Sequence, residues 1–448
     1  MPQTRIGRLA SLALAAGELA IGGLAERVRQ LAARERARGS DLGPAVDALL
    51  SAGNARRLAD RLARLRGGAM KLGQMLSLQG EDLLPPEFAQ ALGMLRAQAA
   101  PMPLKQLRGV LGREYGKGWR QRFEHFDEEP IAAASIGQVH RARTVDGREL
   151  ALKIQYPGVA RSIRSDVANL AALLRLLDLF PRGTDIDALA AEAAQQLARE
   201  ADYLAEAEFL ERYAKLVADE PLLQMPRVHR DATTARILAM DYMPGEPLET
   251  LGDPGVPQAT RDAVGTVLER LLFRELFEFR TMQTDPNFAN YLWRSDTGRV
   301  VLLDFGATVD FPEDFADGYA RITRAIIDGD LEAVTRHAVA IGYALADDPP
   351  EQVRAAVDLI MTVCEPLRAI GPYDFAASDL PSRSRDLGFE LGFRQRLLRT
   401  PPPKTMFLHR KLAGSFLLLA RIGARVDARA IALALIERRL RGKRRRAR

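Results

Sequence analysis

The chain has 448 residues, of which 47% are hydrophobic and 27% charged, with a formal net charge of +6. This composition excludes a mostly disordered chain, and the length allows two or three domains with a substantial core. The single cysteine, Cys364, excludes an intramolecular disulfide, and the histidines lack ligand-like spacing, so no structural zinc site is expected. No uncharged apolar stretch of about 18 residues occurs, so no transmembrane helix is predicted.

The first 125 residues are predicted to be helical and to fall into two parts. Residues 1–65 include the Arg-flanked, Ala-rich segment LASLALAAGELAIGGLA, which we expect to be retained and which could lie on a membrane surface. Residues 66–125 include AMKLGQMLSLQ, a predicted helix that stops at LLPPEF. Lys71 and Gln74 share one face of this helix, and their spacing alone favours an amphipathic edge over a functional site.

Residues 126–243 are predicted to form a lobe of strands with inserted helices. EEPIAAASIGQVHRARTVDGRELALKIQ predicts a strand, a tight loop, a strand, an Asp146–Gly147 turn and another strand. Helices follow at residues 159–180 and, as one long helix, at residues 185–218. Two further strands are predicted within residues 225–248, where the chain leaves the lobe through a Pro-Gly segment.

Lys153 is the candidate for a lysine that contacts the α- and β-phosphates of a nucleotide. It lies mid-strand in ALKI, among apolar neighbours. Such a lysine needs a carboxylate partner, and Glu206 is the first choice in the long helix, with Glu200 the second. The alternative is an ordinary edge-strand lysine.

The loop AAASIGQ, residues 132–138, stands where a kinase has a glycine-rich loop over the phosphates. Alanine keeps the backbone N–H donors but adds Cβ bulk and disfavours positive φ, so this loop should be stiffer. Apolar side chains on either side are expected to sandwich adenine, and a connector after the sheet to read its edge. The predicted nucleotide contacts are Ile131, Ala133, Ala134, Ser135, Gly137, Gln138, Val139, Lys153, Met240, Asp241, Tyr242 and Met243.

Residues 244–437 are predicted to be mostly helical, interrupted by one hairpin. In TDPNFANYLWRSDTGRVVLLDFGAT, Asn290 follows Asp285 by five positions, and two short strands lead to Asp304 of an Asp-Phe-Gly motif. The hairpin brings Asn290 and Asp304 to one end, where their oxygens could hold Mg²⁺ against phosphates. Asp285 would act as a base or orient water. A surface hairpin with incidental polar residues is the alternative.

These residues jointly resemble the UbiB/ADCK family of atypical kinase-like proteins, and its coenzyme Q branch most of all. K-L-G-Q at Lys71 matches the family's K-x-G-Q motif, AAASIGQVH its Ala-rich loop, and Glu200-Ala201-Asp202 its E-x-D motif. The late stretch PPPKTMFLHRK, residues 401–411, also resembles family sequence. The family's nucleotide, ion-pair, catalytic and metal positions fall on Lys153, Glu206, Asp285, Asn290 and Asp304.

The resemblance implies an α+β, two-lobed protein-kinase-like fold, predominantly helical, that binds ATP or ADP with Mg²⁺. It also implies that the N-terminal helical extension covers the cleft, so that Lys71 and Gln74 meet Glu200 and Asp202 and contribute to catalysis. Gln283 and Thr284 stand in place of the His-Arg that precedes the catalytic Asp of ordinary kinases. No A-P-E motif and little length for an activation loop follow Asp-Phe-Gly, so a platform for protein substrates is missing.

The residues and the resemblance allow three functions. We favour an Mg²⁺-dependent ATPase, or a kinase of small or lipid-like molecules, that supports ubiquinone biosynthesis at the inner membrane of a bacterium, on the cytoplasmic side. Its expected partners are a quinone or isoprenoid lipid, an anionic membrane surface and quinone biosynthetic proteins. The second candidate is a nucleotide-binding pseudokinase that scaffolds such a biosynthetic complex, and the third is a protein kinase. The sequence leaves the phosphoryl acceptor and the oligomeric state open.

The C-terminal residues 438–448 form a predicted basic tail, RRLRGKRRRAR. It could contact anionic lipid or be a solvated end, and the sequence favours neither. No nucleic-acid motif accompanies it, so nucleic acid is not an expected partner.

Overall fold

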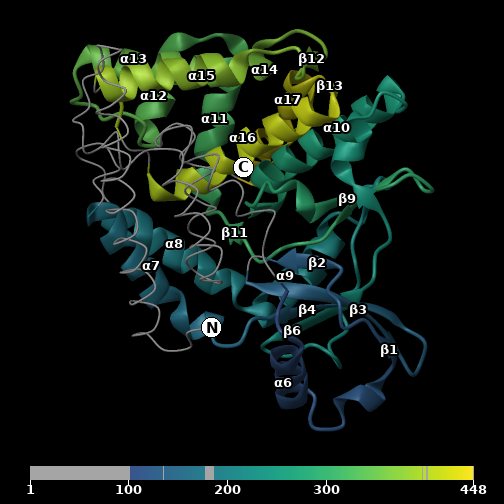
Figure 1. Cartoon of the computed structure of the whole chain (residues 1–448). Coiled ribbons are helices and arrows are strands. Elements are labelled where there is room, and N and C mark those ends of the chain that lie inside the picture. Colours follow the sequence, from purple (N-terminus) through teal and green to yellow (C-terminus); the bar gives the residue numbers. More distant parts are fainter. Residues whose placement is uncertain (1–100, 135, 177–185, 396, 400–401, 447–448) are drawn as a thin grey trace, which may run out of the picture. The chain divides into compact units, whose positions relative to one another are not determined.

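The computed structural model describes residues 101–134, 136–176, 186–395, 397–399 and 402–446 (Figure 1). They divide into two compact units. Unit 1 holds the described residues up to Ala207 together with Val228–Tyr242, and unit 2 holds Glu208–Arg227 and the described residues from Met243 onward. Lys71, Gln74 and Ser135 lie outside the described residues, as do the helices predicted before residue 100, and the predicted domain boundaries stay predictions.

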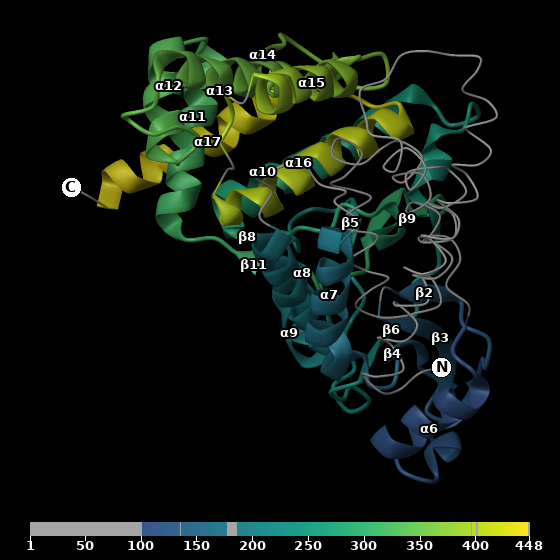
Figure 2. The same ribbon diagram turned by 60° about the vertical axis from the view of Figure 1, so that its left-hand side comes forward.

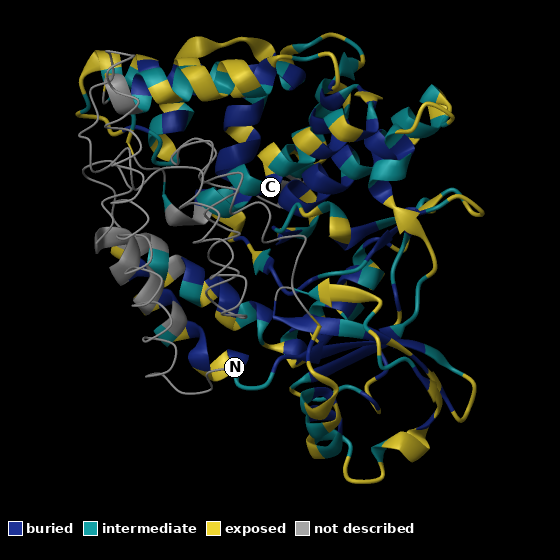
Figure 3. Cartoon of the chain, in the orientation of Figure 1, coloured by how far each residue is buried: buried dark blue, intermediate teal, exposed yellow. Residues whose placement is uncertain are grey.

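Unit 1 is built on a five-stranded antiparallel sheet with the order β1–β3–β4–β6 and β2 paired to β3. Every residue of β4 after Glu149 is buried, as the apolar run around Lys153 requires (Figure 3). The predicted turn between β3 and β4 is present, with Gly147 at φ +85°. The strands are β1 (Phe123–Phe126), β2 (Ala132–Ala134), β3 (Gly137–Thr144), β4 (Glu149–Gln155) and β6 (Ile237–Asp241).

The helices of unit 1 correct one prediction. The chain between residues 185 and 218 is two helices, α8 (Ile186–Glu200) and α9 (Tyr203–Leu216), and α9 continues into unit 2. The break occurs because the Asp202 carboxylate accepts a hydrogen bond from the Ala205 N–H at 3.0 Å and so caps a new helix. Helix α7 (Val159–Leu176) lies beside α8 (Figure 2). Before the sheet come α6 (Leu104–Glu114) and the short η2 (Trp119–Arg122).

A second correction concerns the two strands predicted within residues 225–248. Only β6 is a full strand, because Val228 makes an isolated bridge to Met240 instead of continuing a ladder. Glu246 and Pro247 form the two-residue strand β7, which belongs to unit 2.

The described residues of unit 2 form three small sheets, and one of them includes the predicted hairpin. Strands β9 (Tyr291–Arg294) and β10 (Arg299–Leu302) pair antiparallel in the register Tyr291↔Leu302, which confirms the hairpin. They form a sheet with β5 (Leu223–Gln224) and β7. The other two pairs are β8 (Thr281–Gln283) with β11 (Thr308–Asp310), and β12 (Tyr373–Asp374) with β13 (Arg425–Val426).

Helices make up most of unit 2. Helix α10 packs against α16 and α17 (Figure 2). Gly265 lets α10 approach the segment between those two helices, since a Cβ there would lie 2.6 Å from the Ala424 Cβ. The helices are η3 (Leu248–Gly252), α10 (Gln258–Arg274), the π-helical η4 (Glu275–Phe279), η5 (Phe288–Asn290), α11 (Glu313–Asp328), α12 (Leu331–Ala340), α13 (Pro350–Val363), α14 (Glu365–Arg368), α15 (Leu380–Phe389), η6 (Glu390–Arg394), α16 (Pro403–Ile422) and α17 (Ala428–Arg446).

Most of the predicted basic tail is helical, because α17 continues to Arg446. Arg439 is nearly buried and bonded within unit 2, with its Nη2 2.6 Å from the Asp317 carboxylate and its Nη1 donating to the Phe277 carbonyl. A wholly solvated end is therefore wrong for this part of the tail. Among the described residues, none of the helices combines the length and apolar character needed to cross a membrane.

Candidate active site

Lys153 of β4 is held by Glu206 of α9, inside unit 1. Its Nζ donates to both carboxylate oxygens, at 2.7 Å and 3.0 Å. The two side chains are 7% and 0% exposed. Of the two predicted partners, Glu206 therefore forms the ion pair, while the Oε1 of buried Glu200 accepts from Gln196 Nε2 at 3.3 Å. A buried ammonium held by two carboxylate oxygens has a fixed position, which a phosphate-contacting lysine requires.

Two further residues complete this cluster, and the sequence analysis missed one of them. The Tyr203 ring centroid lies 5.4 Å from Lys153 Nζ, within the range of a cation–π contact. Gly137 lies beside it, since a Cβ there would stand 2.8 Å from the Tyr203 Oη and collide with the Ile154 carbonyl. Position 137 of the Ala-rich loop therefore has no room for a side chain between β4 and α9, which explains the glycine. The signal for Tyr203 was its i, i+3 spacing to Glu206 on one helix.

The Ala-rich loop is a tight hairpin of β2 and β3. Ala132 pairs with Val139 across it, and the Ile131 N–H donates to the Val139 carbonyl at 2.8 Å. Ala133 is exposed and Ala134 half-buried. The Gln138 side chain, in contrast, is buried: its Oε1 accepts from the Met102 N–H at 2.7 Å and its Nε2 lies 2.6 Å from His140 Nε2. That side chain fastens the hairpin inside unit 1.

The predicted connector residues, which begin in the last two positions of β6, are bonded mainly to unit 1. Met240 is buried, and the Asp241 carboxylate lies 2.7 Å from His229 Nε2. The Tyr242 ring stacks on the Arg141 guanidinium at 4.4 Å, and its N–H donates to the Glu149 carbonyl. Met243 is the first residue of the chain to rejoin unit 2.

In unit 2, the hairpin brings Asn290 and Asp304 to the same end, as predicted. The Leu303 N–H donates to the Asn290 carbonyl at 3.0 Å, which ties the two segments together. Asn290 Nδ2 donates to the Asp285 carbonyl at 3.1 Å, and Asp304 Oδ1 accepts from the Gly306 N–H at 3.0 Å. One amide oxygen and one carboxylate suit Mg²⁺, a cation that takes few protein ligands and completes its shell with phosphate and water.

Across the described part of the chain, no group of three or more His, Cys, Asp or Glu side chains could hold a metal ion.

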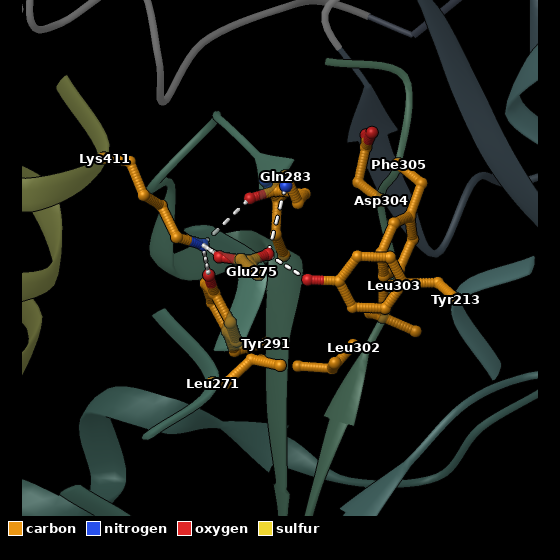
Figure 4. Close-up of a pocket in the computed structure, with 11 residues that line it drawn as sticks. Tyr213, Leu271, Glu275, Gln283, Tyr291, Leu302, Leu303, Asp304, Phe305 and Lys411 are labelled. Atoms are coloured by element: carbon orange, nitrogen blue, oxygen red, sulfur yellow. Dashed lines mark hydrogen bonds and ion pairs between the residues drawn. The ribbon is translucent and has the colours of Figure 1, made fainter. Parts of the chain in front are cut away.

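Beneath the hairpin lies a buried polar network that the sequence analysis missed (Figure 4). Lys411 of α16 lies 3.5 Å from Glu275 and donates to Tyr291 Oη at 3.2 Å and Gln283 Oε1 at 3.3 Å. Glu275 also accepts hydrogen bonds from the Gln283 N–H and the Tyr213 hydroxyl. Lys411 ends the PPPKTMFLHRK stretch noted in the sequence, but nothing there showed that its ammonium is buried.

Burial and charge set the protonation of this network. Burial raises the pKa of the Glu275 carboxyl. Burial alone would lower the pKa of Lys411, but Glu275 and Tyr291 more than offset it and hold that pKa above its ordinary value. Lys411 is therefore a cation at neutral pH. The cavity between the network and Asp304 measures about 10 Å³, which is far too small for a nucleotide.

The chain after Asp304 turns back at once. Phe305 is buried against Tyr213, with ring centroids 4.5 Å apart. Strand β11 begins at Thr308 and pairs with β8, and α11 begins at Glu313. The segment between Asp304 and α11 is therefore short, as its sequence predicts.

Comparison with known proteins identifies the family. The profile of the ABC1 atypical kinase-like domain matches residues 94–338, more than half of the chain. The chain belongs to this family. The predicted UbiB-type kinase-like protein is thereby confirmed, and with it the α+β protein-kinase-like fold and the assignment to atypical kinases, in the phosphotransferase class.

Individual relatives of this ABC1 protein match over nearly its whole length. The mitochondrial atypical kinase COQ8B of Rattus norvegicus is 40% identical over 429 residues, covering 96% of this chain and 80% of the relative. The mitochondrial atypical kinase COQ8 of Saccharomyces cerevisiae is 36% identical, covering 95% and 83%. Among solved structures, the complex of Rv3197 with erythromycin from Mycobacterium tuberculosis matches with a TM-score of 0.59 and 27% identity, covering 86% of this chain and 96% of that one.

Proposed function

We propose that this protein is an Mg²⁺-dependent ATPase, or a kinase of a small or lipid-like molecule, that supports ubiquinone biosynthesis at a membrane surface. The observation that carries the proposal is the hairpin geometry of unit 2, where Asn290 is bonded to the Asp285 carbonyl and lies at the same end as Asp304. Bound Mg²⁺ would neutralise phosphate charge there and orient the γ-phosphoryl group.

Each of the proposed roles falls on a residue with a suitable environment. Lys153, fixed by Glu206, would hold the α- and β-phosphates, and Asp304 with Asn290 would hold the cation. Half-buried Asp285 would accept a proton from the attacking hydroxyl or orient water. That all five side chains act on one nucleotide is part of this proposal, as are the roles of the Ala-rich loop and the connector.

The acceptor is proposed to be water or a small molecule because of the short segment after Asp304. Ordinary protein kinases need a long activation segment to seat a peptide, whereas here β11 and α11 follow within a few residues. The coenzyme Q resemblance and the similarity to COQ8-type atypical kinases support a role in quinone synthesis. Lys71, Gln74, Glu200 and Asp202 are proposed to act together over this site, as the resemblance implies.

The test is ATP turnover by the purified full-length protein with Mg²⁺, with and without anionic liposomes. We expect slow hydrolysis that rises with liposomes and is lost in Asp304→Asn. Asp296→Asn is the matched control, because Asp296 lies in the turn of the same hairpin with its side chain 63% exposed, and it should behave as wild type. The quinone profile of cells lacking the protein tests the pathway, and an unchanged profile contradicts it.

Two other outcomes would replace the proposal. Nucleotide binding without turnover under any condition would indicate a pseudokinase scaffold for a quinone biosynthetic complex. Efficient phosphorylation of added peptides would indicate a protein kinase and would contradict the argument from the segment after Asp304.

A further inference from the structure

The residues before the proposed catalytic Asp285 are uncharged, yet two cations from a distant helix reach them. Ordinary kinases carry His-Arg in front of this Asp, and here the positions are Gln283 and Thr284. We propose that Arg410 and Lys411 of α16 are positioning residues for Asp285, replacing from outside the loop the basic group that the loop lacks. The role of Asp285 itself rests on the proposed function.

Arg410 binds the residue immediately before Asp285. Its Nε donates to the Thr284 carbonyl at 2.9 Å and its Nη2 donates to the Thr284 hydroxyl at 3.1 Å. The same hydroxyl donates to the Ala307 carbonyl at 2.7 Å, and the Thr284 N–H donates to that carbonyl at 3.1 Å. One guanidinium therefore fixes the peptide leading into Asp285 and, through Thr284, the segment that follows the Asp-Phe-Gly motif.

Lys411 binds Gln283, the residue before Thr284. Its Nζ donates to Gln283 Oε1, and Gln283 Nε2 donates to the Asp285 carbonyl at 2.9 Å. This carbonyl also accepts from Asn290 Nδ2 at 3.1 Å. The chain Lys411–Gln283–Asp285–Asn290 thus joins the buried ammonium to the proposed catalytic loop and to one proposed metal ligand.

Glu275 supplies the counter-charge for the buried Lys411 ammonium and also binds the loop. It accepts from the Gln283 N–H at 3.0 Å and lies 3.5 Å from Lys411 Nζ, so the carboxylate binds the loop backbone as well as the cation. Glu275 opens a π-helical turn that ends at Phe279, and the next residue, Arg280, has a φ of +56°. Such turns often mark functional sites, because they redirect side chains of an otherwise regular helix.

A third residue of the same helix face allows the contact. Gly414 stands four positions after Arg410, on the same side of α16. A Cβ at Gly414 would overlap the side chain of Pro286, the residue after Asp285. Helix α16 and the loop that carries Asp285 are in contact at this point. Because Gly414 has no side chain, α16 lies close enough for Arg410 and Lys411 to reach the loop.

The test compares four variants of the full-length protein. Lys411→Met keeps the length and removes the charge, and Arg410→Lys keeps the charge and removes the two-pronged contact. The double variant Glu275→Gln/Lys411→Met removes both buried charges and restores electrical balance. Arg421→Gln is the control, because Arg421 is an exposed residue of the same helix. Each is measured for thermal stability, for hydrogen exchange of the peptide spanning residues 281–291, for kcat and for the KM of Mg-ATP.

We expect exchange in this peptide to speed up several-fold in Lys411→Met, Arg410→Lys and the double variant, and to be unchanged in Arg421→Gln. We expect kcat to fall at least about tenfold with KM changed less than about twofold, because the loop is displaced while nucleotide contacts remain. The double variant should regain thermal stability without regaining kcat.

The outcomes separate this inference from the proposed function. If exchange is as slow in all variants as in wild type, the positioning role is refuted, whatever the activity. Recovery of both slow exchange and kcat in the double variant also refutes it, since the pair would then be structural only. A wild-type protein with no turnover contradicts the proposed function, while the exchange result still decides whether α16 holds the loop.

Discussion

The ion pair between Lys153 and Glu206 gives the sharpest prediction for stability. Glu206→Gln should lower the unfolding free energy of unit 1 by about 3–5 kcal/mol, because it leaves a buried ammonium without its counter-charge. This magnitude follows from the burial of both side chains, 7% and 0% exposed, and from two short bonds of 2.7 Å and 3.0 Å. Lys153→Met should cost a similar amount, whereas Lys153→Met/Glu206→Gln should cost much less than the sum of the two.

The assay is urea unfolding followed by tryptophan fluorescence in a Trp293→Phe background. The chain has two tryptophans, and this change leaves Trp119, which lies in unit 1, as the reporter. The matched control is the pair Arg141–Glu149 on the same sheet, also 3.0 Å apart but 44% and 39% exposed. Removing Glu149 should cost less than about 1 kcal/mol. A cost below that value for Glu206→Gln, or strict additivity of the Lys153 and Glu206 variants, would show that this buried ion pair does not stabilise unit 1.

Three further changes probe separate features. Gly137→Ala should destabilise unit 1 by about 1–3 kcal/mol in urea unfolding, because its Cβ meets β4 and Tyr203, and a neutral effect would contradict that packing. Burial raises the pKa of Glu269 from 4.5 to about 7. The folded protein therefore loses stability as pH rises from 4.5 through 7, because the buried carboxyl must then ionise. Glu269→Gln should stabilise the protein by up to about 3 kcal/mol at pH 8 and by very little at pH 4.5. Gly414→Ala should lower kcat, because it pushes α16 from Pro286, and full activity would show that the contact is dispensable.

Much of the candidate site was predictable because its signals are local. Short apolar strands separated by turn residues predict hairpins, and both the Asp146–Gly147 turn and the hairpin ending at Asp304 are present in the structure. The prediction that Glu206, and not Glu200, pairs with Lys153 is also confirmed, because the Glu206 carboxylate accepts from Lys153 Nζ.

The break between α8 and α9 was missed for a physical reason. The apolar pattern continues across it, and Ala201 favours a helix as strongly as its neighbours do. What interrupts the helix is the capping bond of Asp202. A further anchor comes from another part of the chain, since Gln155 Nε2 donates to the Ala201 carbonyl at 3.0 Å. Tertiary contacts of this kind leave no trace in the periodicity of a helix.

The network of Lys411 was hidden for a related reason. Lys411 and its partner Gln283 lie 128 positions apart, and charged residues are ordinarily expected at the surface. Only the structure shows that this cation is buried together with Glu275, directly under the loop that carries Asp285.

This arrangement changes how a degenerate motif should be interpreted. Scored by position, Gln283 and Thr284 look like the loss of a catalytic His-Arg. Their contacts show something else: Arg410 donates to the Thr284 carbonyl and Lys411 donates to the Gln283 side chain, and both cations come from α16. Charge-assisted hydrogen bonds can fix the backbone of the loop that carries Asp285 whether or not the donor is close to it in the sequence. The absence of His-Arg is therefore weak support for an inactive protein, and the decisive comparison is whether an inactive relative has also lost the cations of the helix that corresponds to α16.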